Sequence, residues 1–189
     1  SPVEDQCIHM IYHGHANPTR KLENLIRMMD YLDERFYLDL MIVPTDMKYF
    51  NLIKEGIKKK PHIRIIPPVK MSEIVFFTNK YDIGIFLSNP ENFNQLHALP
   101  NKFFEYIQAR LAIAIGPSPE MAEIIKKYDL GVVAEDFEPG SLARELNKIT
   151  IEDLVYFKNQ CHRSAIQLSS EKNLKILDKI IKKLIYSSV

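Results

Sequence analysis

Short apolar runs alternate with longer amphipathic runs along this chain, and no other feature of the sequence limits its fold as strongly. The short runs have the length and composition of β-strands, and they occupy residues 7–12, 37–43, 63–66, 82–87, 112–115 and 131–133. The segments between them carry apolar residues at helical spacing, over residues 19–35, 46–60, 71–79, 101–109 and 119–128. Strands separated by helices in this way form a parallel sheet covered by helices, so we predict a doubly wound α/β domain of about six strands.

The C-terminal part of the chain is predicted to be helical, over residues 139–148, 151–167 and 171–186. We find no internal repeat and no interior linker, and therefore predict a single domain over residues 1–189. Capping residues or prolines mark several helix starts: Thr19 or Asn17, Ser72 or its neighbour, Pro100 at the first helical position, and Ser118.

Composition removes several classes of protein. The 189 residues include 25 Lys and Arg against 24 Asp and Glu, a net charge of +1, so there is no basic field for nucleic acid or an anionic membrane. No apolar run approaches the ~18 residues of a membrane span, and we expect no signal peptide before Ser1. Cys7 and Cys161 have the spacing of neither a disulfide framework nor a metal site, so a reducing, cytoplasmic setting is expected.

Three segments follow predicted strands, where the ligands of such sheets bind. They are His13–Gly14–His15 with the turn to Arg20, Pro68–Val69, and the 88–99 loop with the helix start after it. That loop is longer than usual for a connection of this kind, so we expect it to be functional.

Gly14 follows the first strand, but GHANPTR lacks the later glycines of a dinucleotide-binding fingerprint and the lysine of a P-loop. It is either a tight turn or a place where the backbone approaches a ligand closely. His9, His13 and His15 share one face of an extended strand, which is the geometry of a metal site. Because His9 is expected to be buried and no carboxylate or cysteine completes a set, we predict no metal site and interpret His15 as a polar ligand contact.

Two basic residues and one acidic residue lie at predicted helix starts. Arg20 either points across the strand ends at an anion or is solvated. Lys102 opposes the dipole at the start of its helix, which is unfavourable unless an anion binds there. Glu105, one turn further in, is either a surface residue or an acceptor for hydroxyl groups.

Two strings in the sequence resemble a known family. IYHGHANPTRKLENLI resembles the opening strand, turn and helix of the C-terminal domain of GT-B glycosyltransferases, in which a glycine, here Gly14, precedes two basic positions. LPNKFFEYIQARLAIAIGPSPEMAEIIKKYDLGVV resembles the donor-site helix, next strand and next helix of that domain, and is similar to the P-N-K-x-x-E-Y version common in family 4-like bacterial transferases. The resemblance covers nearly the whole chain and implies a Rossmann-like, donor-binding domain.

Residue by residue, the resemblance places Glu105 where a donor-site glutamate accepts hydrogen bonds from ribose hydroxyls. His15 and Arg20 fall on two phosphate-binding positions, where arginine and lysine are usual. Val69 matches a position that contacts the nucleotide base through its backbone, and Asn101 and Lys102 match the diphosphate end of the donor. The resemblance thus implies that Arg20 and Lys102 stabilise the departing diphosphate.

The sequence departs from the family pattern at several positions. His97 stands eight residues before Glu105, where many family 4 members have the first glutamate of a pair, and we assign it to the donor site with that change. Which sugar hydroxyls are held is therefore left open. Arg110 and Ala112 replace a usual glycine and proline, and both changes are interpreted as structural.

The function implied is transfer of sugar from a nucleoside diphosphate sugar, by resemblance a UDP-sugar, to a surface-glycan or lipid-linked acceptor in bacterial polysaccharide biosynthesis. Retaining, metal-independent chemistry without a resident cofactor is expected. The family's N-terminal acceptor domain is absent from this sequence, so the chain is expected to be half of an enzyme and inactive alone. That missing domain could also place the enzyme at the inner face of the membrane. Two alternatives stay open: half of a nucleotide-sugar epimerase, and a non-catalytic α/β module that binds a nucleotide or a protein.

Overall fold

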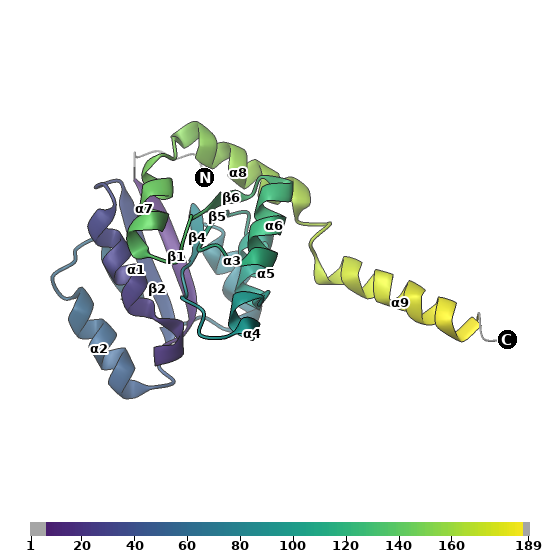
Figure 1. Cartoon of the computed structure of the whole chain (residues 1–189), viewed down its shortest axis with the longest axis horizontal. Helices are drawn as coiled ribbons and strands as arrows, with labels where there is room; N and C mark the ends of the chain where they lie inside the picture. The colour runs from purple at the N-terminus through teal and green to yellow at the C-terminus, as the bar shows by residue number, and fades with distance from the viewer. Residues whose placement is uncertain (1–6, 187–189) are drawn as a thin grey trace.

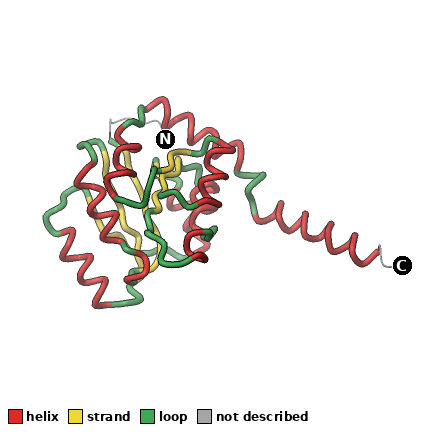
Figure 2. Tube along the Cα trace, viewed as in Figure 1, coloured by secondary structure: helices red, strands yellow, loops and turns green. Residues whose placement is uncertain are grey.

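A computed structural model describes residues 7–186, in which six strands form one parallel sheet (Figure 1). The strands are β1 (Ile8–His15), β2 (Phe36–Val43), β3 (Ile63–Ile66), β4 (Ile83–Phe86), β5 (Ala112–Ile115) and β6 (Gly131–Val133). Their order across the sheet is β3-β2-β1-β4-β5-β6, and helices cover both faces (Figure 2). The predicted fold class, a Rossmann-like doubly wound α/β sheet, is confirmed.

Each face of the sheet is covered by its own set of helices. One face packs against α1 (Leu22–Met28), α2 (Met47–Ile57) and α7 (Pro139–Asn147). The other packs against α3 (Ile74–Thr78), α5 (Asn101–Gln108) and α6 (Pro119–Tyr128). The helix α8 (Ile151–Ser164) contributes Leu154 to the first layer and Cys161 to the second, so it joins the two layers at one end of the molecule.

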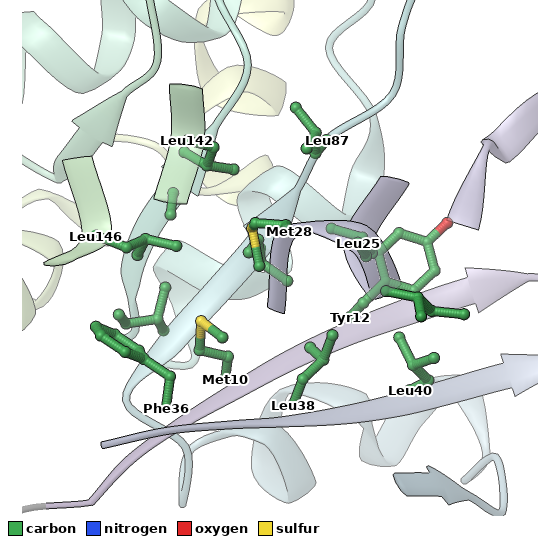
Figure 3. Packing of buried hydrophobic residues seen from close by; sticks show 14 of the residues in the cluster. Met10, Tyr12, Leu25, Met28, Phe36, Leu38, Leu40, Leu87, Leu142 and Leu146 are labelled. Atoms are coloured by element: carbon green, nitrogen blue, oxygen red, sulfur yellow. The ribbon is translucent and has the colours of Figure 1, made fainter. Parts of the chain in front are cut away.

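The core follows from strand periodicity. On β1, Met10 and Tyr12 face the α1 and α7 layer, whereas Ile11, between them, packs in the opposite layer. Figure 3 shows Met10 and Tyr12 lying against Leu25 and Met28 of α1. Burial of one such side chain typically contributes about 1.5–3 kcal/mol, so the sheet and its two helix layers hold the strand ends in fixed positions.

The first predicted helix, over residues 19–35, is longer than the observed helix α1, Leu22–Met28. Residues 18–20 form a separate 3-10 turn, and Lys21 adopts a left-handed conformation (φ 48°) that breaks the chain before α1. Neither Thr19 nor Asn17 caps α1, because the Thr19 hydroxyl donates to the Asn17 side chain at 2.6 Å. Met29–Tyr31 tighten into a second 3-10 turn, which ends the helical segment before residue 35.

Other predicted helix starts also need correction. Pro100 has extended backbone (ψ 149°) and is the N-cap of α5 rather than its first residue. Ser118 is the N-cap residue of α6, as predicted, but its hydroxyl donates to the Leu96 carbonyl at 2.5 Å instead of accepting from the helix. Ser72 lies within the 3-10 turn Met71–Glu73, which precedes α3 and has no side-chain cap. The expected 88–99 loop contains a short helix, α4 (Phe93–Leu96).

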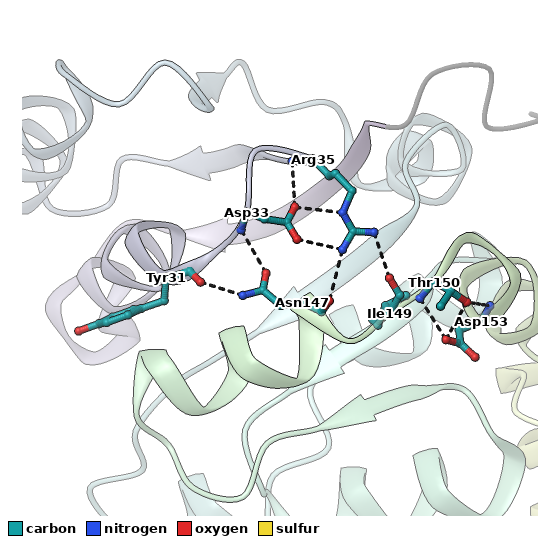
Figure 4. Close-up of polar contacts among 7 residues, drawn as sticks. All are labelled: Tyr31, Asp33, Arg35, Asn147, Ile149, Thr150 and Asp153. Carbon is teal, nitrogen blue, oxygen red and sulfur yellow. Dashed lines mark hydrogen bonds and ion pairs between the residues drawn. The ribbon is translucent and has the colours of Figure 1, made fainter.

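A polar network holds the C-terminal helices to the amino ends of the strands (Figure 4). Arg35, just before β2, pairs with the Asp33 carboxylate and donates to the Ile149 carbonyl at 3.2 Å. The Asn147 side chain donates to the Tyr31 carbonyl at 2.9 Å. The connection between α7 and α8 is thus fixed at the end of the sheet opposite to the carboxyl ends of the strands.

The last helix, α9 (Ser170–Tyr186), extends away from the sheet and its helices (Figure 1). Its start and end agree with the predicted 171–186 segment. Among the described residues, no helix is long and apolar enough to cross a membrane. The single-domain prediction covers residues 1–189, of which residues 1–6 and 187–189 lie outside the described part of the chain.

Candidate functional site

The strand order reverses direction between β1 and β4, because β2 and β3 lie on one side of β1 and β4, β5 and β6 lie on the other. In open parallel sheets, ligands bind in the crevice outside the carboxyl ends of the strands at such a switch point. A cavity of about 380 Å³ occupies this position. It is therefore the place where a ligand is expected.

The cavity is lined by seven of the eight residues assigned to the donor site from the sequence: Gly14, His15, Arg20, Val69, Asn101, Lys102 and Glu105. They come from the end of β1 and the turn after it, the segment after β3, and the first turns of α5. These segments are far apart in the sequence, and the parallel sheet brings them to one edge.

The structure does not place His97 in this cavity. Its ring lies 4.2 Å from the Phe93 ring, and its Nδ1 lies 3.2 Å from a Glu120 carboxylate oxygen at the start of α6. The assignment of His97 to the donor site came from counting residues along the chain back from Glu105. The short helix α4 and the extended Pro100 intervene, and they direct this ring toward α6.

Gly14 does not form a tight turn, which was one of its two interpretations, and close approach of a ligand to its backbone stays a prediction. It has φ +150° and lies within β1 rather than in a turn. A Cβ atom there would lie 2.8 Å from Lys102 Nζ and 3.3 Å from Tyr12 Oη. The group that approaches Gly14 is therefore the ammonium of Lys102, which no sequence pattern had indicated.

Lys102 is held among aromatic rings at the start of α5. Its Nζ lies 3.9 Å from the centre of the Tyr12 ring and 5.3 Å from that of Phe86. Burial and, to a smaller extent, the positive charge of Arg20 lower the pKa of Lys102 from 10.5 to about 7, with Glu105 acting in the opposite direction. Within residues 7–186, neither Lys102 nor Arg20 has a carboxylate at ion-pair distance. Two basic groups therefore meet at one cavity, and the Glu105 carboxylate that also lines it is not at ion-pair distance from either.

Glu105 lines the same cavity one turn beyond the start of α5, and its side chain is 24% exposed. Burial raises the pKa of this carboxyl group, whereas the nearby Lys102 lowers it. The cavity consequently has a basic part at Arg20 and Lys102, and a hydrogen-bond acceptor at Glu105. Apolar side chains after β3, including Val69, Met71 and Ile74, complete its wall.

Two residues at the site were not assigned to the donor from the sequence: Tyr12, whose ring lies beside the Lys102 ammonium group, and His13. His13 is 5% exposed, lines the cavity, and packs edge-on against Tyr106 with ring centres 5.1 Å apart. Burial lowers the pKa of His13 from 6.5 to about 3, and Lys102 contributes to the shift. The period-two pattern of β1 could have indicated a buried ring here, because His13 falls on the face of Ile11.

The prediction that His9 is buried is wrong. His9 lies near the amino end of β1 and is exposed, and its backbone N–H donates to Asp82 Oδ2 at 2.9 Å. It is thus separated from the cavity by the length of the strand. Across residues 7–186, no three His, Cys, Asp or Glu side chains gather in a way that could hold a metal ion.

No family model matches the sequence, and no curated protein matches it either. Solved structures do match. HepE from Anabaena, in complex with UDP and glucose, has a TM-score of 0.70 at 14% identity, covering 97% of this chain and 49% of that one. A glycosyltransferase from Rickettsia africae has a TM-score of 0.72 at 19% identity, covering 95% and 49%. The C-terminal domain of the glycosyl transferase LpcC from Francisella tularensis has a TM-score of 0.67 at 15% identity, covering 85% of each chain.

These matches show that the chain has the Rossmann-like fold found in GT-B glycosyltransferases. The chain spans about half the length of HepE and of the Rickettsia enzyme, and 44% of WaaG, a glycosyltransferase involved in lipopolysaccharide biosynthesis. At these sequence identities the likeness establishes the fold.

Proposed function

We propose that this chain is the donor-binding domain of a glycosyltransferase and that its cavity binds a nucleoside diphosphate sugar. The observation that carries the proposal is the pair of basic residues, Arg20 and Lys102, that meet at the strand ends without a carboxylate partner in the described chain. A diphosphate would supply the missing anion. The N-terminus of α5 and the ammonium of Lys102 would face it together.

The remaining parts of such a donor fit the rest of the cavity. In this proposal Asn101 and His15 contact the diphosphate beside Lys102, and Glu105 accepts hydrogen bonds from ribose hydroxyls. The base lies along the apolar wall and contacts the backbone of Val69. We take the base as uracil, because the family resemblance implies a UDP-sugar, and because HepE has been solved with UDP-glucose.

The proposed chemistry is stabilisation of a leaving group. When the glycosidic bond to the diphosphate breaks, negative charge grows on the departing oxygen. Basic side chains and a helix N-terminus already directed at that position stabilise the charge in the transition state. Arg20 and Lys102 take this role, so the proposal needs no resident metal or cofactor, and the sugar nucleotide is a substrate. Retention at the transferred sugar is proposed from the family resemblance.

The acceptor is assigned to a second domain of a longer protein. The resemblance implies a surface-glycan or lipid-linked acceptor in bacterial polysaccharide biosynthesis. The enzyme would then act at the cytoplasmic face of the membrane. The TarM structure, in complex with UDP and alpha-GlcNAc-glycerol, is an example of a neighbour that holds both a nucleotide and a sugar compound. The present chain alone is expected to bind donor and to transfer no sugar.

Calorimetric titration of the 189-residue chain tests the proposal. UDP and UDP-glucose should bind, Lys102→Met should weaken that binding, and Lys126→Met, on the exposed face of α6, should leave it unchanged. Absence of binding for UDP, ADP, GDP and CDP would contradict the proposal and favour a protein-binding module. Sugar transfer by the isolated chain would contradict its assignment as half of an enzyme. In a longer protein, epimerisation of the free sugar nucleotide would favour the epimerase alternative.

A further inference from the structure

His13 is a buried imidazole with an unused nitrogen at the cavity. The residue is 5% exposed, and within the described structure its Nε2 has no hydrogen-bond partner. Buried polar atoms in folded proteins almost always have a partner, because leaving one unpaired costs free energy. His13 lines the cavity, so the missing partner of Nε2 is expected to come from a ligand.

The position of Glu105 indicates what kind of group this partner is. A Glu105 carboxylate oxygen, Oε2, lies 3.4 Å from His13 Nε2, but the two atoms do not form a hydrogen bond. Because the pKa of His13 is lowered to about 3, its ring is neutral near pH 7 and has one N–H donor and one acceptor nitrogen. A phosphate oxygen beside the Glu105 carboxylate would be repelled, whereas a hydroxyl can donate to the carboxylate and accept from the ring.

We propose that His13 Nε2 and the Glu105 carboxylate together bind one sugar hydroxyl, which donates to Glu105 and accepts from the Nε2–H group of His13. This inference rests on the proposed function, because it requires a ligand that carries a sugar. It makes His13 a binding residue and assigns the ring proton to Nε2. The hydroxyl belongs either to the ribose of the nucleotide or to the transferred sugar.

A ring replacement tests this pair. His13→Phe keeps an aromatic ring beside Tyr106 and removes both nitrogens, and His9→Phe makes the same change on the exposed part of β1 as a matched control. Each variant of the full chain is titrated with UDP, 2′,3′-dideoxy-UDP and UDP-glucose. One hydrogen bond to a neutral group corresponds to roughly a 3- to 10-fold change in affinity.

If the hydroxyl is on the ribose, His13→Phe weakens UDP binding by that factor and leaves dideoxy-UDP unchanged. If it is on the transferred sugar, the loss appears for UDP-glucose and not for UDP. In both cases His9→Phe binds like the unchanged protein. Equal affinities of His13→Phe and the unchanged protein for all three ligands would overturn the inference while leaving the proposed function intact. Failure of the unchanged protein to bind UDP or UDP-glucose would overturn both.

A measurement on the unchanged protein covers the case in which His13→Phe does not fold. With ¹⁵N-labelled histidine, the ring nitrogens of His13 report their protonation and hydrogen bonding by NMR. Addition of saturating UDP-glucose should move the Nε2 signal of His13, with the proton on that nitrogen, and leave the ring signals of His9 in place. An Nε2 signal that does not move at saturation would overturn the inference.

Discussion

The ammonium group of Lys102 occupies the space that a side chain on Gly14 would fill, since a Cβ atom there would lie 2.8 Å from Nζ. The end of β1 and the start of α5 therefore fit together at Gly14 and Lys102. Because Gly14 has no side chain, the ammonium group of Lys102 can lie against the backbone of β1.

Gly14→Ala should therefore both strain the backbone and displace Lys102. An alanine at φ +150° costs about 1–3 kcal/mol of stability, and UDP binding should fall toward the level of Lys102→Met. Gly56→Ala is the control, because its Cβ on α2 would lie 3.7 Å from the nearest side chain. Urea unfolding and calorimetry measure the two effects. Normal UDP affinity in folded Gly14→Ala would show that the position of Lys102 does not matter.

Binding of a diphosphate ligand should be accompanied by protonation of Lys102. Without ligand, burial and Arg20 hold its pKa near 7, so a large fraction of the side chain is neutral at pH 8. A bound diphosphate favours the charged form and raises this pKa. Affinity should thus fall as pH rises from 7 to 9, by up to about tenfold per unit. Titrations at pH 8 in buffers of different ionisation enthalpy measure the uptake, which Lys102→Met should remove.

Arg20→Ala and Lys102→Ala should weaken diphosphate binding selectively. A charge-assisted hydrogen bond contributes about 1.5–3 kcal/mol, which corresponds to roughly 10- to 150-fold in affinity for each variant. Uridine lacks the phosphates, so its weaker binding should change little. Lys126→Ala serves as a control for charge on the protein surface. Equal losses for uridine and UDP in Lys102→Ala would mean that the lysine holds the cavity in shape rather than binding phosphate.

His13 should make the protein sensitive to acid. Its pKa is about 3 in the folded protein and about 6.5 in the unfolded chain, so between these values only the unfolded chain binds the proton. Stability attributable to His13 is present above pH 6.5 and is lost as pH falls toward 3, at up to about 1.4 kcal/mol per pH unit. Denaturant unfolding between pH 4 and 7 should show a flatter pH dependence for His13→Phe than for the unchanged protein. An identical slope would contradict the neutral, buried ring.

Sequence patterns predicted the sheet well because each buried strand is itself a short run of apolar residues, which can be recognised without knowing the rest of the fold. The runs 63–66, 112–115 and 131–133 coincide with β3, β5 and β6. Conformations set by a single residue were not predicted. The left-handed Lys21 delays the start of the first helix to Leu22, and this was not predicted because no local signal requires a lysine at φ 48°.

The same distinction applies to the site. Gly14, Arg20 and Lys102 were found because each follows a strand or begins a helix, and parallel strands bring such positions to one edge. His97 was assigned from the number of residues between it and Glu105. The short helix α4, which ends just before His97, means that this number does not indicate how close the two side chains lie in space. His13 was placed in a ligand-facing segment and weighed as a metal ligand but was given no role of its own, although its position opposite Tyr12 on β1 indicated a buried ring facing α5.

Glu105→Gln should weaken nucleotide binding by about 1–3 kcal/mol with little loss of stability. The carboxylate can accept from two ribose hydroxyls, whereas an amide has a single acceptor oxygen. The side chain is 24% exposed and makes no hydrogen bond within the described chain, so an amide of the same shape breaks no hydrogen bond of the fold. UDP and 2′,3′-dideoxy-UDP titrated in parallel measure the effect, with thermal unfolding as the check on stability. The dideoxy ligand offers Glu105 no ribose donor, and its affinity should scarcely change. Equal losses of affinity for the two ligands would contradict a contact between Glu105 and the ribose. The proposed orientation of the nucleotide in the cavity would then have no support.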